Sequence, residues 1–372
     1  MGWGRRAAVA ALAAVAAWAV GPRAAWAWGD EGHQRVNRAA AEALPGDAPA
    51  CLRRAVERLA YLGPEPDRWR EGDLVAMAKG LGPDHFVDLE LTKGLVDPAS
   101  PPPTRHEYAR ALAEGGQAPE KVGFGPYRAL ELCQRLEAAV ASLVRLDPDA
   151  PDAPARRAQA EENVVWTAGV LGHYVADLAN PHHTTIHYDG WKGPENPEGF
   201  STERGAHARF ESSFVARLGP AARVEVTAPV RADLDYAQAL WAHVLEAHAL
   251  VPDLYRLDRD GAFAEGLEAT EVGRRGADFA RARMQAGATL LRDLWATACA
   301  RGAGRGARQR LGEAVYGALS RAGLFVRAKV GDDGVVTLSG RVGAPEDARR
   351  AVEVVERVPG VRAVVARLEA LY

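Results

Sequence analysis

Apolar residues recur at intervals of three and four along much of the chain between residues 28 and 300. The spacing is clearest over residues 130–143 and 234–248 and is looser over residues 279–295. Such spacing places the apolar side chains on one face of an α-helix. Because strand-like alternation is rare here, the pattern predicts a mainly α-helical domain. In residues 130–143 the repeating positions are Leu130, Cys133, Leu136, Val140 and Leu143.

Two stretches interrupt the helical pattern. Three prolines at residues 101–103 stand inside a polar stretch from Leu91 to Gly125, which predicts a long loop. Further on, residues 301–307 read Arg-Gly-Ala-Gly-Arg-Gly-Ala, a composition typical of flexible linkers. We therefore predict that a linker at residues 301–307 separates the domain of residues 28–300 from a second one.

Beyond the linker, over residues 308–372, the periodicity changes to that of a small mixed domain. Its order αββαβ predicts a separate α+β unit. The predicted elements are a helix (311–321), two strands (324–330 and 335–341), a helix opened by Pro345 and ended by Pro359-Gly360, and a last strand (361–368).

The first 27 residues have the order of a secretory signal peptide. Arg5-Arg6 precedes an apolar run from Ala7 to Val20, and Ala25-Trp26-Ala27 is a cleavage site of the A-x-A kind. The apolar run is too short to span a bilayer, which takes about 20 residues. We expect cleavage between Ala27 and Trp28 and export of the mature protein to the periplasm or the medium.

Composition narrows the classes of partner. A formal net charge of −3 disfavours binding to nucleic acid or anionic lipid through bulk charge, so any contact with phosphate must come from a local site. Cys51, Cys133 and Cys299 allow at most one internal disulfide. Their spacing is not that of a zinc knuckle.

Residue types that bind zinc occur at helical spacing in the predicted helical domain. His173 and Asp177 are four residues apart, so both project from one face of a helix. His207 and Glu211 repeat this arrangement on another predicted helix. Pro181 ends or bends the first helix and directs the next histidines back towards it. A single pair of this kind is more often a hydrogen-bonded or salt-bridged helix face than a metal site.

Further candidate ligands lie earlier in the chain. Asp67 stands in Pro-Asp-Arg-Trp, His85 stands in Asp-His-Phe-Val-Asp, and His33 follows Trp28 by five residues. Each alone has an ordinary explanation, such as a packed histidine or a frayed chain end. Together with the two helical pairs they predict a metal cluster.

These motifs resemble the superfamily of zinc-dependent phospholipases C and single-strand-specific zinc nucleases. The start Trp28-Gly-Asp-Glu-Gly-His33 is most similar to the nuclease version, and the segment from His173 to His183 is similar to the signature that both share. Gly-Ala-His207-Ala-Arg-Phe-Glu211 resembles the phospholipase version, because the nucleases usually have aspartate last. The resemblance covers about residues 28–294 and implies a multi-helix domain.

The resemblance implies three zinc ions. His183 rather than His182 has the family spacing of ten residues from His173; His182 and His187 flank the site and are candidates for substrate contact. Trp28 is implied to bind through its terminal nitrogen and its carbonyl oxygen, so we hypothesise that signal-peptide cleavage also activates the protein. The implied ligands are Asp67, His85, His173 and Asp177 for one zinc, His183, His207 and Glu211 for a second, and Trp28, His33 and the other oxygen of Asp177 for a third.

The implied chemistry is hydrolysis of a phosphodiester bond by a zinc-activated water. Zinc lowers the pKa of bound water toward 7. Asp67 is expected to orient this water and to accept its proton as the catalytic base. Direct in-line attack needs no serine or cysteine nucleophile.

The C-terminal αββαβ unit resembles a BON domain, a module of the bacterial envelope. The resemblance rests on residues 336–342, the helix of residues 348–358 and the following Pro-Gly-Val. That family is associated with phospholipid surfaces, which implies peripheral membrane contact. A general protein-interaction or dimerisation module is the alternative.

Four functions are open at this stage. Glu211 and the BON-like unit favour a phospholipase C-like activity, whereas the start from Trp28 to His33 favours a single-strand nuclease or 3'-nucleotidase. The rebuilt segment between His183 and Gly205 matches neither specificity pocket. A non-catalytic zinc-binding envelope protein and a membrane-surface adaptor are the remaining alternatives. Structural zinc sites usually close at four ligands without water, which disfavours a purely structural cluster.

Overall fold

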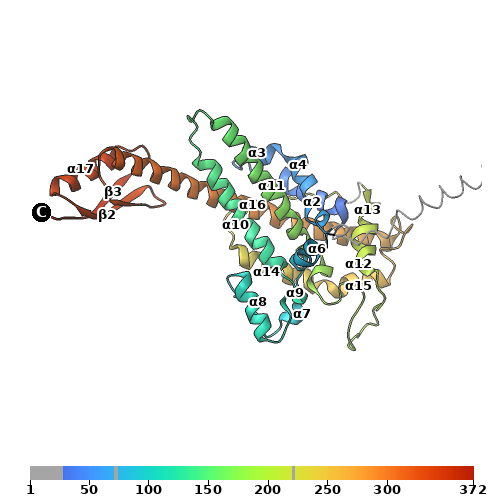
Figure 1. Cartoon of the computed structure of the whole chain (residues 1–372). Helices are drawn as coiled ribbons and strands as arrows, with labels where there is room; N and C mark the ends of the chain where they lie inside the picture. The colour runs from blue at the N-terminus through green and yellow to red at the C-terminus, as the bar shows by residue number, and fades with distance from the viewer. Residues whose placement is uncertain (1–27, 71–73, 220–222) are drawn as a thin grey trace, which may run out of the picture.

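The computed structural model describes residues 28–70, 74–219 and 223–372. The predicted signal peptide, residues 1–27, lies outside these ranges. The described chain is mostly helical, with a three-stranded sheet near its C-terminus (Figure 1). The predicted class, a mainly α-helical chain that ends in a small α+β unit, is therefore confirmed.

Helices of very different lengths make up the larger part. The α-helices are α2 (Gly29–Glu42), α3 (Ala50–Arg54), α4 (Val56–Leu62), α5 (Glu65–Arg68), α6 (Val75–Leu81), α7 (Leu89–Thr92), α8 (Arg105–Glu114), α9 (Pro119–Val122), α10 (Gly125–Arg145), α11 (Ala153–Ala179), α12 (Ala206–Ala208), α13 (Val215–Arg217), α14 (Tyr236–Ala249), α15 (Val251–Arg259), α16 (Glu271–Arg321) and α17 (Pro345–Glu356). The 3₁₀ turns η1 (Gly82–His85) and η2 (Pro181–Thr184) and the π-helical turn η3 (Arg209–Phe214) lie among them.

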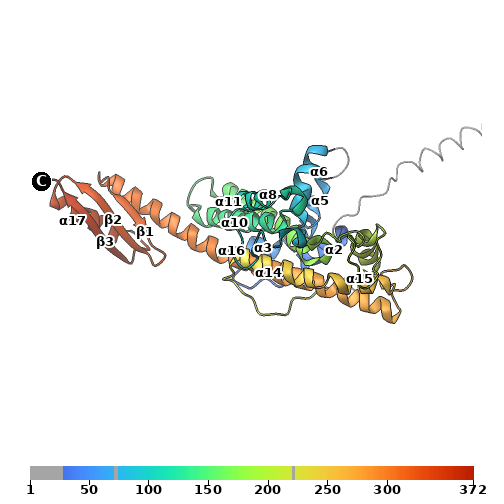
Figure 2. The ribbon, with the colours of Figure 1, turned by 90° about the horizontal axis from the view of Figure 1, so that it is seen from below.

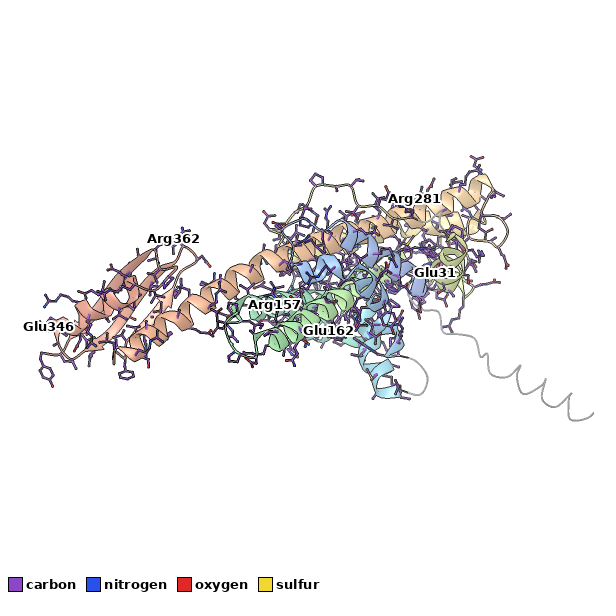
Figure 3. All side chains as sticks on the ribbon, turned by 90° about the horizontal axis from the view of Figure 1, so that it is seen from above. Glu31, Arg157, Glu162, Arg281, Glu346 and Arg362 are labelled. Carbon is purple, nitrogen blue, oxygen red and sulfur yellow. The ribbon has the colours of Figure 1, made fainter. Side chains whose placement is uncertain are left out.

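Helix α11 lies at the centre of the helical domain. Its first half is exposed, and Arg157 and Glu162 stand on the surface there (Figure 3). Its second half is almost entirely buried and contacts α2, α4, α10, α14 and α16. A helix that is apolar on all sides belongs in a protein interior. Polar residues on this half, such as His173 and Asp177, are consequently held in the core.

The helices predicted from apolar spacing are confirmed. Residues 130–143 lie in α10, residues 234–248 lie mostly in α14, and residues 279–295 lie in α16. Helix α11 stops two residues before Pro181, which has no N–H to continue the helical hydrogen bonds, and η2 follows.

The long loop predicted for residues 91–125 is wrong, because this segment contains α8 and α9. Helix α8 begins where the Thr104 hydroxyl accepts a hydrogen bond from the backbone N–H of Glu107 at 3.2 Å. A threonine cap followed three residues later by glutamate is a helix-start signal. The prolines of residues 101–103 belong to the connection before this cap.

The flexible linker predicted for residues 301–307 is also wrong, because α16 runs through this segment without a break (Figure 2). Gly302 and Gly306 are buried against α10. A Cβ atom at Gly302 would lie 2.6 Å from the carbonyl oxygen of Glu137, and one at Gly306 would lie 2.5 Å from that of Ala141. These glycines allow two helices to pack closely and do not interrupt the helix.

The C-terminal unit has the predicted αββαβ order, with the end of α16 as its first helix. Strand β1 (Arg327–Val330) pairs antiparallel with β2 (Val335–Val342), and β2 pairs parallel with β3 (Ala363–Ala370). Val336 and Leu338 face a small core formed with α16 and α17. This core is separate from that of the helical domain.

Two further expectations concern membranes and cysteines. None of the helices in the described ranges is long and apolar enough to cross a bilayer. Cys51, Cys133 and Cys299 are all buried and free, so the single disulfide that their number allowed is not formed.

Candidate metal centre

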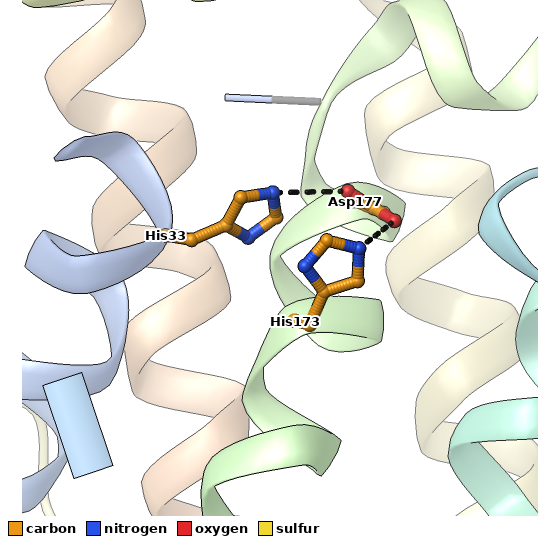
Figure 4. A group of neighbouring side chains, drawn as sticks. All are labelled: His33, His173 and Asp177. Atoms are coloured by element: carbon orange, nitrogen blue, oxygen red, sulfur yellow. Dashed lines mark ion pairs between the residues drawn. The ribbon is translucent and has the colours of Figure 1, made fainter. Parts of the chain in front are cut away.

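Asp177 lies between two histidines from different helices (Figure 4). His173 precedes it by one turn of α11, and His33 comes from α2. Asp177 Oδ2 is 3.2 Å from His173 Nε2, and its Oδ1 is 3.5 Å from His33 Nε2. All three side chains are fully buried. Each carboxylate oxygen thus faces a different imidazole, which is an arrangement suited to bridging two metal ions.

Asn37 fixes the position of α2 against α11. Its side-chain amide donates to the carbonyl oxygens of Leu59, at 2.8 Å, and of Gly169, at 2.9 Å. A Cβ atom at Gly172 would lie 1.9 Å from Asn37 Oδ1, so only glycine fits there. Because Asn37 follows His33 by one helical turn, this contact also turns His33 toward α11.

His85 and Asp67 complete a group of four around Asp177. His85 Nδ1 is 2.9 Å from both Asp177 Oδ2 and His173 Nε2. Asp67 Oδ1 is 3.8 Å from His85 Nδ1 and 3.7 Å from His173 Nε2. Tetrahedral zinc with bonds of about 2.0–2.2 Å needs ligand atoms roughly 3.3–3.6 Å apart. The distances between these ligand atoms, from 2.9 to 3.8 Å, lie on both sides of that range.

Hydrogen bonds at the Nδ1 atoms of His173 and His183 determine which ring nitrogen faces the other ligand side chains. His173 Nδ1 lies 2.9 Å from the carbonyl oxygen of Gly63, and His183 Nδ1 lies 2.7 Å from that of His85. A carbonyl only accepts, so Nδ1 carries the hydrogen and Nε2 of the neutral ring presents a lone pair. Backbone carbonyls commonly support metal-bound histidines in this way.

A second group of ligand types lies beside the first. Glu211 Oε2 is 2.7 Å from His207 Nε2 and 3.3 Å from His183 Nε2, and the two Nε2 atoms are 3.1 Å apart. The Asn180 side-chain amide donates to Glu211 Oε2 at 2.8 Å. The predicted helix carrying His207 and Glu211 is a short α-helical turn that continues as the π-helical turn η3. Such π-helical turns occur frequently at functional sites.

The buried carboxylates fit a bound cation. Among the described residues, no hydrogen-bond donor reaches Asp67 Oδ2, Asp177 Oδ1 or Glu211 Oε1. Burial raises the pKa of Asp67 to about 7 and that of Asp177 to about 8, because an ionised carboxylate loses its hydration there. A metal ion would supply both the missing charge and the missing coordination. Ligand types, spacing and orphaned oxygens are therefore those of a group that could hold metal ions.

The protonation states of His173, His85 and Glu211 also suit metal binding. Burial lowers the pKa of His173 to about 4 and that of His85 well below its usual range, so both rings are neutral near pH 7. Burial alone would raise the pKa of Glu211, but the neighbouring His207 and His183 lower it to about 2. Neutral imidazole and ionised carboxylate are the forms that coordinate metals.

Trp28 anchors the start of α2 next to the cluster. Its side chain is fully buried, and its indole Nε1 donates to the carbonyl oxygen of Ala176 at 2.6 Å. Its ring also contacts Phe210, with 5.4 Å between centroids. The Trp28 side chain thus lies against the backbone of Ala176, the residue that precedes Asp177. Ligation through its main-chain atoms stays a prediction.

Both groups open into a cleft of about 840 Å³. His85 of the first group and His183 and His207 of the second lie on its wall. Among its other lining residues, cationic side chains outnumber carboxylates, which suits a phosphate-bearing ligand. These charged residues are Arg70, Lys121, Lys192, Arg204, Asp88, Glu120 and Asp189.

Arg70 is a site residue that the sequence motifs did not predict. Its Nη1 lies 3.3 Å from Asp67 Oδ1, and it lines the cleft. The available signal was its position three residues after Asp67, which is contact distance along a helical turn. Of the two flanking histidines, His182 lines the cleft, whereas His187 stacks on Trp191.

The comparisons with known proteins identify the C-terminal unit alone. Residues 308–371 match the family model of the BON domain, which confirms that prediction. No family model matches the helical domain. No curated protein matches the chain.

Proposed function

We propose that residues 28–300 form a secreted, zinc-dependent phosphodiesterase of the phospholipase C kind. The observation that carries the proposal is the meeting of eight ligand side chains in two adjoining groups beside one cleft. Buried carboxylates and imidazoles at this density are costly without a cation. A side open to a cleft is typical of catalytic zinc sites.

The proposed ligands divide among three ions. When bound, zinc supplies a Lewis acid for the phosphoryl oxygens and lowers the pKa of water toward 7. The ligands are Asp67, His85, His173 and Asp177 for the first ion, His183, His207 and Glu211 for the second, and His33, Asp177 Oδ1 and the terminal amine and carbonyl of Trp28 for the third.

Asp67 is the proposed catalytic base. Arg70 contacts its Oδ1, while no donor among the described residues reaches its Oδ2. With Arg70 holding its Oδ1, the Asp67 carboxylate would bind the first ion and accept a proton from the attacking water. Arg70 also brings a fixed positive charge to the cleft, where it helps to offset the charge that develops on phosphate oxygens.

A structural zinc protein and an inactive adaptor are the competing proposals. The group of His183, His207 and Glu211 offers three ligands rather than four and lies at the cleft, which favours catalysis. Asp67→Asn separates these alternatives. In an enzyme this substitution lowers turnover by about 10²–10⁴, as expected for the loss of a general base. A structural or adaptor protein would keep its lipid or partner binding unchanged.

A single-strand nuclease or 3'-nucleotidase is the alternative enzyme. The motif from Trp28 to His33 favours it, and both residues lie beside the cluster. Glu211 and the adjoining BON domain favour a phospholipid substrate. We therefore place phospholipid first and test both substrates side by side.

We further propose that the BON domain contacts an anionic lipid surface. The sheet face opposite its small core carries four cations and one acidic residue. Phe325 precedes β1 and is 88% exposed. An exposed aromatic ring beside cations is typical of peripheral membrane-binding surfaces. The charged residues on this face are Arg327, Lys329, Arg341, Arg367 and Glu369.

Helix α16 determines where the BON domain lies with respect to the cleft. The helix has 51 residues and is continuous, so it spans roughly 75 Å. A continuous helix of this length places the sheet at one end of the molecule, away from the other helices (Figure 1). The BON domain would therefore orient the enzyme on a surface instead of tethering it loosely.

The first experiment uses mature protein that starts at Trp28. Zinc is counted by elemental analysis, and turnover is measured on phospholipid vesicles and on single-stranded DNA, with Asp67→Asn as the matched variant. About three zinc ions per chain with release of a phosphorylated head group supports the proposal. Release of nucleotides supports the nuclease alternative. A protein that binds no zinc refutes both.

A further inference from the structure

A lysine lies over a tyrosine at the cleft, on the loop that follows the ligand His183. Lys192 Nζ is 3.9 Å from the centre of the Tyr188 ring, and both residues line the cleft. The Tyr188 ring is 6.2 Å from the ring of His207, a member of the second ligand group. The pair of Tyr188 and Lys192 is therefore next to the place where the phosphodiester would bind.

The backbone of the turn that carries this pair is held in place by several contacts. The Tyr255 hydroxyl donates to the carbonyl oxygen of His187 at 2.5 Å and accepts from the backbone N–H of Gly190 at 3.1 Å. The backbone N–H of Lys192 donates to His187 Nδ1 at 3.0 Å. The His187 ring stacks on Trp191 at 3.9 Å. The backbone on both sides of the pair is thus fixed, which lowers the entropy cost of recognition.

The same turn is tied to the metal-ligand segment. Asp189 Oδ1 accepts from the backbone N–H groups of Gly205, at 2.6 Å, and His207, at 3.4 Å. Arg204 Nε lies 3.4 Å from Asp189 Oδ2. Asp189 is consequently engaged by its own loop and is not a free counter-charge for a cationic ligand.

We infer that Tyr188 and Lys192 recognise the head group and select phospholipids that lack a cationic head group, such as phosphatidylglycerol. This inference rests on the proposed function. A quaternary ammonium group binds over the face of an aromatic ring, but Lys192 already covers that face of Tyr188. The Lys192 ammonium instead donates hydrogen bonds to hydroxyl or anionic oxygens.

Charge repulsion sets the size of the effect. A choline group competing for the Tyr188 face would stand roughly 5 Å from the Lys192 ammonium in a partly hydrated cleft, where like charges disfavour binding by about tenfold. The expected preference for phosphatidylglycerol over phosphatidylcholine is therefore about tenfold or more in kcat/KM, mainly through KM.

The test compares wild type with Lys192→Ala and Lys192→Glu on short-chain phosphatidylglycerol and phosphatidylcholine. Lys93→Ala is the control, because Lys93 is exposed and does not line the cleft. Binding of non-hydrolysable phosphonate analogues of both lipids is measured in parallel. We expect Lys192→Ala to reduce the preference about tenfold, Lys192→Glu to reverse it, and Lys93→Ala to leave it unchanged.

The outcomes separate this inference from the proposed function. A wild-type preference for phosphatidylcholine, or an unchanged preference in both Lys192 variants, overturns the inference while the proposed function stands. Cleavage of single-stranded DNA and of neither lipid overturns the inference in favour of a nucleic-acid substrate. If nothing is cleaved, the proposed function fails, and equal binding of the two analogues by wild type and Lys192→Ala then overturns the inference as well.

Discussion

Replacing Asp177 with asparagine distinguishes a metal site from a network of structural ion pairs. Asp177 Oδ2 lies 2.9 Å from His85 Nδ1 and 3.2 Å from His173 Nε2. Asparagine has nearly the same shape without the charge. If these contacts are structural ion pairs, the substitution destabilises the protein under all conditions. If they form a metal site, the substitution removes, in the metal-free protein, the cost of burying a carboxyl group.

The magnitude follows from the pKa of this carboxyl group. Burial raises it from 3.8 to about 8 in the metal-free protein. The folded state then holds the proton more tightly than the unfolded state, so the contribution to stability is complete below about pH 4 and is lost as the pH rises to about 8. At pH 7 the stability lost is at most on the order of 4 kcal/mol.

Thermal unfolding with chelator and with zinc provides the assay. In chelator at pH 7, Asp177→Asn is expected to melt about 5 °C or more above wild type, since about 1 kcal/mol corresponds to roughly 2–4 °C. The difference should grow up to about pH 8. At zinc concentrations about 100-fold above Kd, wild type gains about 2.7 kcal/mol per site. The variant lacks a ligand shared by two sites, so the order of melting temperatures reverses.

Asp293→Asn is the matched control. Asp293 is also buried, but it accepts hydrogen bonds from Arg292, at 2.6 Å, and Arg231, at 3.0 Å. Breaking this pair should cost about 3–5 kcal/mol with or without zinc. If Asp177→Asn also melts below wild type in chelator, the cluster is a structural network of ion pairs and not a metal site.

Three other predictions test separate parts of the structure. Zinc must displace protons from Asp67 and Asp177, whose metal-free pKa values are about 7 and about 8. The affinity for zinc should therefore rise from pH 6 to 8, and calorimetry in two buffers should detect the released protons. Zinc binding without proton release would contradict the proposed ligand set. Gly302→Val should destabilise the protein by about 1–3 kcal/mol in urea unfolding, because the new valine side chain meets α10. Gly304→Ala should stabilise it by about 0.5–1 kcal/mol, because no atom lies within 4 Å of the added Cβ. Equal changes in stability for the two variants would argue against the packing of α16 on α10. One residue added before Trp28 should remove about one zinc per chain and lower turnover, because an amide nitrogen replaces the amine; a fully active extended protein would show that cleavage does not activate.

Helical repeat alone was enough to predict the ligand pairs. Residues four apart lie on one face of any α-helix, so the spacing of His173 and Asp177 predicts that they lie side by side in any tertiary fold. The same spacing brought His207 next to Glu211 even though part of that segment is a π-helical turn.

Glycine composition did not distinguish a linker from a helix contact. Residues 301–307 are rich in glycine in either case, since glycine both loosens a free chain and allows two helices to approach closely. The segment is a helix contact and not a linker only if another element packs against it. Helix α10 does so, and residues distant in the chain provide that contact.

The sequence by itself determined the helices with regular apolar spacing, the extent of the BON domain and the residue types able to bind metal, because these depend on short-range spacing and side-chain chemistry. Only the tertiary structure decided which of them meet. His33 reaches Asp177 because Asn37 joins α2 to α11, and Lys192 covers Tyr188 because Tyr255, distant in the chain, holds their loop. Such contacts follow from how whole helices and loops pack, and local periodicity does not specify that packing.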